Sequence, residues 1–182
     1  MLKHALLVAG FLLLVGAAQA ESLYGLGRAP TEQEIAAWDI AVGPAGEELP
    51  AGAGDVARGS SLFAMHCAAC HGASGHEGPD DRLVGGHGSL NSSAPKKTIG
   101  SFWPYATTVF DYIRRAMPFP APGSLSNDDV YALTAYLLHK NAVVVENFVA
   151  NRESLPAVVM PNRDGFVIDP RPETFDQALT AP

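Results

Sequence analysis

The stretch Cys67-Ala68-Ala69-Cys70-His71 decides the fold, and it contains both cysteines of the chain. Two thiols at this spacing lie about one helical turn apart, so both can reach the same planar cofactor. The imidazole of the following histidine can then bind the metal of that cofactor. This spacing is the attachment signature of haem c. A thioredoxin-like pair or half of a zinc site could share it, but no strand pattern precedes it and no second cysteine pair exists. We predict one covalent haem, attached through Cys67 and Cys70 and ligated by His71.

The segments around this motif indicate a helical domain. Residues 55–66 have the apolar pattern of a helix that runs into Cys67. Gly59 inside it costs about 1 kcal/mol relative to alanine, which indicates close approach of a second helix. Residues 126–141 supply that helix, with a Ser-Asn-Asp-Asp cap and an apolar stripe. A first helix with Gly and Phe that crosses a last helix with an aromatic residue resembles the class I cytochromes c. The resemblance implies an all-α fold of three to four helices around one haem c.

The same resemblance implies a second iron ligand opposite His71, a methionine in the loop before the last helix. Met117 occupies that place. Prolines in the segment 117–123 can hold a weak thioether ligand in position. Met117 could instead fill core space, as most methionines do. The spacing does not exclude Met160 as the ligand. Met65 lies close before the motif in sequence, which ties it to the His71 side of the haem. Met117 is the predicted ligand, and Met160 is the alternative.

Further haem contacts are implied by the resemblance and by the needs of buried carboxylates. The backbone carbonyl at Gly78-Pro79 resembles the one that accepts the other N–H of His71 in this family. Leu83 is a candidate for the apolar wall of the haem pocket on the His71 side. A general role in the hydrophobic core fits the sequence equally well. Buried haem propionates need hydrogen-bond donors. The candidates in the aromatic segment 98–115 are Trp103, Tyr105, and Arg114 or Arg115.

One stretch narrows the resemblance. Ser101-Phe102-Trp103-Pro104-Tyr105-Ala106-Thr107-Thr108 and residues 111–118 are similar to the cytochrome c subunit of bacterial sulfite dehydrogenases and to the haem subunit of Sox sulfur dehydrogenase. In that family a separate molybdenum-cofactor subunit oxidises the sulfur compound and passes electrons to the haem subunit. The Sox haem subunit is usually longer and carries a second haem. The single motif of this chain fits the sulfite dehydrogenase subunit better.

The resemblance therefore implies an electron-transfer subunit that is not an enzyme by itself. Its partners would be the molybdenum-cofactor catalytic subunit of a sulfite dehydrogenase and a downstream cytochrome c or oxidase. Two alternatives are a free, diffusible periplasmic carrier and the haem subunit of a different sulfur-oxidising molybdenum dehydrogenase. A haem enzyme with its own chemistry would need an open iron position.

The first twenty residues, MLKHALLVAGFLLLVGAAQA, have the pattern of a secretory signal peptide that is cleaved after Ala20. Their apolar run is shorter than the roughly 18 residues that span a bilayer, which argues against an uncleaved anchor, and no later stretch is long enough either. The expected location is the periplasm, with no membrane span after cleavage. The formal net charge of −7 makes nucleic acid an unexpected partner.

The chain is expected to have four parts. Thr31 and Glu34 have the spacing of a capping box, which predicts a short helix in the N-terminal extension. The C-terminal tail is rich in proline and is predicted to be extended, either wrapping a partner or lying on its own domain. The predicted parts are a signal peptide (1–20), an N-terminal extension (21–54), a cytochrome c domain (55–146) and an extended tail (147–182).

Overall fold

The structure, a computed structural model, describes residues 26–167 and residue 169. Its elements are helix α2 (Glu32–Trp38), strand β1 (Ala53–Asp55), helices α3 (Val56–His66), α4 (Ala68–His71), α5 (Ala106–Ala116) and α6 (Asn127–Lys140), and strand β2 (Val149–Asn151). The chain divides into two compact units at the Asp39–Ile40 bond. The predicted signal peptide and tail residues 170–182 lie outside the described residues. Within the described part, no helix has the length and apolar character to cross a membrane.

The first unit contains α2, and its capping box is present as predicted. The backbone N–H of Glu34 donates to Thr31 Oγ1 at 3.2 Å, and the backbone N–H of Thr31 donates to Glu34 Oε2 at 2.8 Å. Arg28 also pairs with the Glu34 carboxylate. Both bonds tie up N–H groups that the first turn of a helix leaves unpaired, so this short helix begins at a defined residue.

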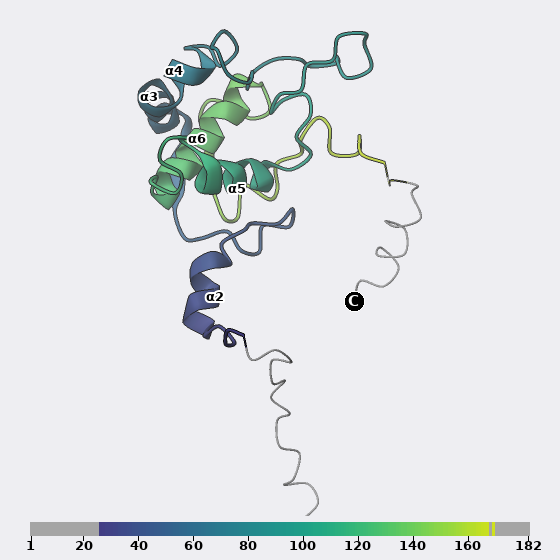
Figure 1. Ribbon diagram of the computed structural model, residues 1–182. Helices are drawn as coiled ribbons and strands as arrows, with labels where there is room; N and C mark the ends of the chain where they lie inside the picture. The colour runs from purple at the N-terminus through teal and green to yellow at the C-terminus, as the bar shows by residue number, and fades with distance from the viewer. Residues whose placement is uncertain (1–25, 168, 170–182) are drawn as a thin grey trace, which may run out of the picture. The chain divides into compact units, whose positions relative to one another are not determined.

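The second unit is built on the crossing of α3 and α6 (Figure 1). A Cβ added at Gly59 would lie 2.0 Å from the carbonyl oxygen of Ala132, so only glycine lets the two backbones come this close. The prediction of a close helix approach at this residue is confirmed. The rings of Phe63 and Tyr136 meet across the same crossing, with centroids 5.3 Å apart.

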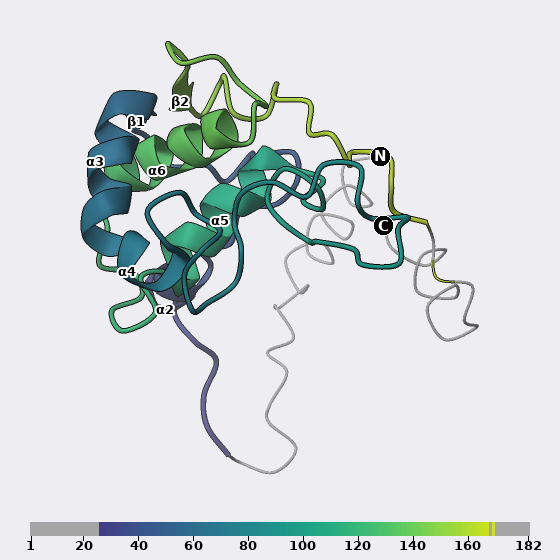
Figure 2. The ribbon, with the colours of Figure 1, turned by 90° about the horizontal axis from the view of Figure 1, so that it is seen from above.

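Helix α5 covers a second side of α6. The rings of Phe110 and Tyr131 lie with centroids 4.4 Å apart, and both side chains are buried. The core therefore consists of three helices, with the four-residue α4 at the end of α3 (Figures 1 and 2). This arrangement confirms the predicted class I cytochrome c fold.

Segments on both sides of the predicted cytochrome domain join its core. Strands β1 and β2 pair antiparallel, with Gly54 opposite Ala150, and Figure 2 shows them side by side near the start of α3. The purely helical prediction missed this ladder, because strands of three residues carry too short an alternating pattern to recognise. The buried apolar residues from the flanking segments are Val42, Leu49, Ala150, Leu155, Val158 and Met160.

The described part of the tail is folded back by turns, which differs from the extended course predicted from its prolines. Turns occupy residues 152–157 and 161–164. Asn151 Oδ1 accepts hydrogen bonds from the backbone N–H groups of Glu153 and Ser154, which bends the chain directly after β2. Through this bend the segment before residue 161 packs on its own domain, which is the second of the two predicted alternatives.

Hydrogen bonds from α5 fasten the segment that precedes β1. The backbone N–H of Val42 donates to Asp111 Oδ1 at 2.8 Å, and Thr107 Oγ1 donates to the carbonyl of Pro44 at 3.0 Å. Arg115 forms an ion pair with the same Asp111 carboxylate. Burial opposes ionisation of Asp111, but the hydrogen bonds from Arg115 and Val42 outweigh it and lower the pKa of this carboxyl.

Candidate haem site

The attachment motif forms one helical turn that continues from α3. The backbone N–H of Cys67 donates to Phe63 O at 2.9 Å, and that of His71 donates to Cys67 O at 2.9 Å, so α4 follows α3 after a break at Cys67. The two cysteines do not form a disulfide with each other. Cys67 is half-buried and Cys70 is exposed.

The environment of the two thiols favours uncharged sulfur. Burial raises the pKa of Cys67 to about 11. A hydrogen bond with the Asp80 carboxylate is the main cause that raises the pKa of Cys70. A thioether sulfur is also uncharged, so the attached form suits the same surroundings.

His71 is held by a backbone carbonyl. Its Nδ1 lies 2.7 Å from the carbonyl oxygen of Asp81. A carbonyl can only accept, so Nδ1 carries the proton and the lone pair of Nε2 is left for a metal. An imidazole held in this tautomer and orientation fits the role of an iron ligand.

The acceptor of this bond differs from the predicted Gly78-Pro79 carbonyl, and that prediction is wrong. A Cβ on Gly78 would lie 2.1 Å from Cys70 O, so this residue packs directly on the backbone of the motif. The backbone N–H of Asp80 then donates to Cys70 O at 3.0 Å. The loop is therefore hydrogen-bonded to the motif as far as Asp80. The carbonyl that accepts from the imidazole belongs to the next residue, Asp81.

A carboxylate that the sequence analysis missed holds the loop directly after the motif. Glu77 accepts hydrogen bonds from the backbone N–H of Ser74 at 2.7 Å and of His76 at 3.1 Å. These bonds lower the pKa of Glu77 to about 2. The spacing Ser-X-X-Glu is a capping pattern, and it could have revealed this contact.

Several apolar side chains at the border of the main core are covered only in part by the protein. Those that pack against the main core while remaining partly exposed include Cys67, Ala68, Leu83, Trp103, Met117, Leu125 and Tyr136. An apolar surface left half covered is costly in water, and the flat faces of a porphyrin could cover it. Together with two reduced thiols and an imidazole with a free Nε2, these residues fit haem c. Leu83, Trp103 and Met117 thus border one core, and their contacts with the haem stay predictions.

The three candidate methionines differ in exposure. Met160 is 1% exposed and belongs to the core, whereas Met65 is 67% exposed on α3. Met117 is half-buried at the C-terminal end of α5, and its backbone N–H donates to Ile113 O at 3.1 Å. A thioether that is anchored but not enclosed suits a ligand position, so Met117 remains the predicted ligand.

The residues predicted to donate hydrogen bonds to the haem propionates make different contacts in the structure. Trp103 packs on the core, with its ring edge against Tyr112 at a centroid distance of 5.7 Å. The guanidinium of Arg163 lies over the ring of Tyr105, 4.4 Å from its centroid. Arg114 Nη1 donates to the carbonyl of Ile40 at 3.0 Å. The arginine therefore holds the segment before β1, and its propionate role stays a prediction, as do those of Trp103 and Tyr105.

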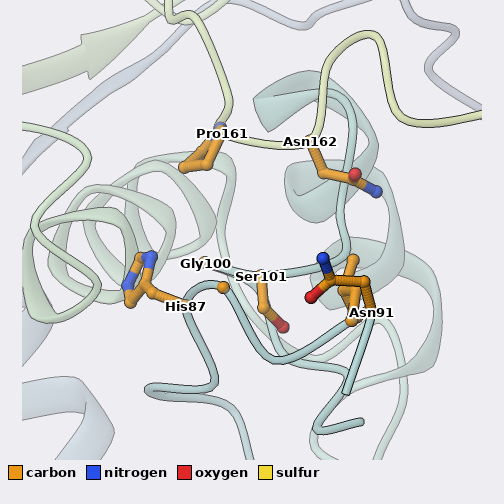
Figure 3. A pocket seen from close by; sticks show the side chains of 8 residues that line it. His87, Asn91, Gly100, Ser101, Pro161 and Asn162 are labelled. Carbon is orange, nitrogen blue, oxygen red and sulfur yellow. The ribbon is translucent and has the colours of Figure 1, made fainter.

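A separate pocket lies between the loop before α5 and the tail (Figure 3). His87 and Asn91 come from the loop, and Asn162 comes from the tail, where its Nδ2 donates to Phe102 O at 2.7 Å. None of the predicted haem residues lines this pocket. It is thus distinct from the site around His71.

Comparisons with known proteins agree with this site. The cytochrome c family model matches residues 56–141. A chain in the crystal structure of the sulfane dehydrogenase SoxCD from Paracoccus pantotrophus is 49% identical, with a TM-score of 0.75, and the match covers 87% of this chain and 78% of that one. A thiosulfate dehydrogenase of Stutzerimonas stutzeri (strain A1501) is 30% identical over 118 residues, which are 55% of this chain and 35% of that protein.

The chain thus spans about a third of the length of the thiosulfate dehydrogenase but most of the SoxCD chain. The high identity with the latter runs well beyond the haem motif, and the site holds both thiols and the oriented imidazole that haem c requires. The chain belongs to the class I cytochrome c family and binds one haem c covalently.

Proposed function

We propose that this cytochrome is the periplasmic electron-transfer subunit of a sulfur-oxidising molybdenum dehydrogenase. The observation that carries the proposal is the similarity to a SoxCD chain over 87% of the sequence. A haem domain alone would match many unrelated cytochromes, because the motif is common to all of them. The flanking segments, which a general electron carrier does not need, are also within the similarity. This extent supports a shared kind of partner.

The residues of the site support one-electron transfer. Bound haem c supplies an Fe(III)/Fe(II) couple. The Asp81 carbonyl fixes the orientation of His71. The partly covered apolar side chains would shield a bound haem from water. Met117, as a soft second ligand, would raise the reduction potential.

The finer part of the proposal is that the partner oxidises sulfite. It is supported by the similarity of residues 101–108 to sulfite dehydrogenase subunits and by the presence of a single attachment motif. The relatives named above make sulfane sulfur and thiosulfate the other two substrates to test. The leader-like residues 1–20 support the periplasm as the location. The electrons would then leave to a downstream cytochrome c or oxidase.

Co-isolation from the native periplasm tests this proposal. The chain, tagged at its C-terminus, is purified at low salt, and the preparation is assayed for haem, for molybdenum and for companion subunits. We expect a second subunit and molybdenum in fixed ratio to haem. A preparation that contains only the cytochrome, at every salt concentration tried, would contradict the proposal and favour a free carrier.

A further inference from the structure

Asn141 is a buried amide that does more than end a helix. It is 2% exposed and caps the C-terminus of α6. Its Nδ2 donates to Leu137 O at 2.9 Å within the helix, and also to Leu83 O at 3.1 Å. Its Oδ1 accepts from the backbone N–H of Gly85 at 3.0 Å. Two of its three bonds therefore reach a loop that lies more than fifty residues earlier in the chain.

Only one orientation of the amide satisfies all three partners. The carbonyls of Leu137 and Leu83 can only accept, so they must face Nδ2, and the N–H of Gly85 must face Oδ1. Close packing adds a second restraint, because a Cβ on Gly100 would lie 2.4 Å from Asn141 Oδ1. Gly100 is also one of the residues that line the pocket in Figure 3.

The loop segment 83–85 is the part of the chain that Asn141 anchors. The remaining bonds of this segment are Leu83 N–H and Val84 N–H to Gly75 O (2.8 and 3.1 Å), Ile99 N–H to Leu83 O (3.2 Å) and Thr98 Oγ1 to Gly85 O (2.5 Å). Among the side chains of the described residues, Asn141 alone bonds to this segment at two places. Asn141 thus holds the segment at both of its ends.

This anchor lies two residues from the carbonyl that holds His71. Asp81 and Arg82 are both exposed, so packing does not hold the backbone between them. The Asp81 carbonyl is positioned instead by the fixed points on either side, which are the Asp80 N–H bond to the motif and the anchored Leu83. A shift of Leu83 would therefore move the oxygen that accepts the Nδ1 proton of His71.

We propose that Asn141 is a positioning residue for the proximal side of the haem. By holding Leu83 and Gly85, it keeps the Asp81 carbonyl in hydrogen-bond distance of His71 Nδ1. A strong bond at Nδ1 makes the imidazole a better donor to iron and favours the oxidised state. The anchor therefore lowers the reduction potential and slows exchange of the Nδ1 proton. The inference requires only that His71 binds the iron, whatever the partner of this cytochrome is.

The test compares Asn141→Ala with the wild-type holoprotein by two measurements. Proton NMR follows the exchange of the His71 Nδ1 proton with solvent, and spectroelectrochemistry gives the reduction potential. We expect exchange to become about tenfold faster, the change that loss of one ordinary hydrogen bond produces. We expect the potential to rise at the same time. Gly100→Ala, which pushes on the Asn141 amide without removing it, should shift both readouts in the same direction.

Asn151→Ala is the matched control. Asn151 also holds a turn through its side-chain oxygen, with bonds of 2.9 and 2.8 Å to the N–H groups of Glu153 and Ser154, but it does not bond to segment 83–85. It should lower stability and leave both haem readouts unchanged. If Asn141→Ala fails to take up haem, Gly100→Ala decides the question. The proposal would be overturned if both readouts stayed unchanged in Asn141→Ala, or in Gly100→Ala where Asn141→Ala takes up no haem. Equal shifts in Asn151→Ala would overturn it too.

Discussion

The candidate methionines for the second iron ligand differ in the exposure of their side chains. Met65 is exposed, Met160 is enclosed by the core, and Met117 lies between these extremes at the end of α5. A ligand needs a partly open position, because the metal must reach its sulfur. These positions favour Met117 over Met160, and the assignment of the ligand stays a prediction.

Met117→Ala tests the ligand directly. Loss of the thioether should convert the low-spin ferric spectrum to a high-spin or water-ligated form and lower the reduction potential, because an axial methionine raises it. Optical and electron paramagnetic resonance spectra of the holoprotein measure both changes. The control, Met160→Ala, should cost about 2–5 kcal/mol of stability and leave the spectrum unchanged. The reverse pattern would assign the ligand to Met160.

Residue identity predicted the covalent part of the site but not its supports. Cys67, Cys70 and His71 are recognisable because their chemistry demands those side chains at that spacing. The acceptor for His71 is a backbone carbonyl, which every residue has, so the sequence could not distinguish Asp81 from its neighbours. Asn141 likewise shows its role only once the chain is folded, because its partners are distant in sequence.

At the scale of elements, helix caps made the boundaries predictable. Ser126 Oγ accepts from the backbone N–H of Asp129, so α6 begins where the predicted cap indicated. Asp55 Oδ1 accepts from the backbone N–H of Arg58 and caps α3 in the same way, one residue later than the helix start predicted from the apolar pattern. The β1–β2 ladder was not predictable, because it depends on pairing between segments nearly a hundred residues apart.

Gly59→Ala tests the helix crossing. The added methyl would overlap the Ala132 carbonyl, so α3 and α6 must move apart, and we expect a loss of about 1–3 kcal/mol in the free energy of unfolding. Urea titration of the holoprotein measures it. The neighbouring exposed variant Ser60→Ala should change stability by less than about 0.5 kcal/mol. A neutral Gly59→Ala would show that the helices do not touch here.

The contact of α5 with the segment before β1 should depend on pH. The folded protein lowers the pKa of Asp111, so this contact contributes its full stability above the unfolded-state pKa of about 4 and loses it as the pH falls through the lower folded value. Asp111→Asn should lower stability at neutral pH and flatten the acid limb of stability. Urea unfolding between about pH 3 and pH 7 measures this. An unchanged acid limb would contradict it, and Asp164→Asn controls for charge removal at an exposed residue.

For the whole molecule, the cytochrome core extends beyond the domain predicted from helical patterns. Leu49 and Leu155 come from segments rich in glycine and proline, yet both are buried. Isolated apolar residues in irregular segments have no periodicity, so sequence analysis could not assign them to the core. The flanking segments therefore contribute to the stability of the haem domain.

Leu155→Ala measures that contribution. The side chain is 0% exposed, so truncation should cost about 2–5 kcal/mol, as in any core. Thermal or urea unfolding of the holoprotein reports the loss. Val159→Ala, four residues later and 79% exposed, is the control and should be close to neutral. Equal, small effects would mean that the tail is only loosely attached.

The most direct test of the proposed function is the reduction of this haem by a sulfur compound. The complex isolated from the periplasm is oxidised, made anaerobic and mixed with sulfite in a stopped-flow spectrometer, with thiosulfate and a sulfane donor in parallel. We predict rapid haem reduction by sulfite in the complex and none in the separated cytochrome. Faster reduction by another of the three compounds would change the substrate alone. No reduction by any of them in the molybdenum-containing complex would contradict the account.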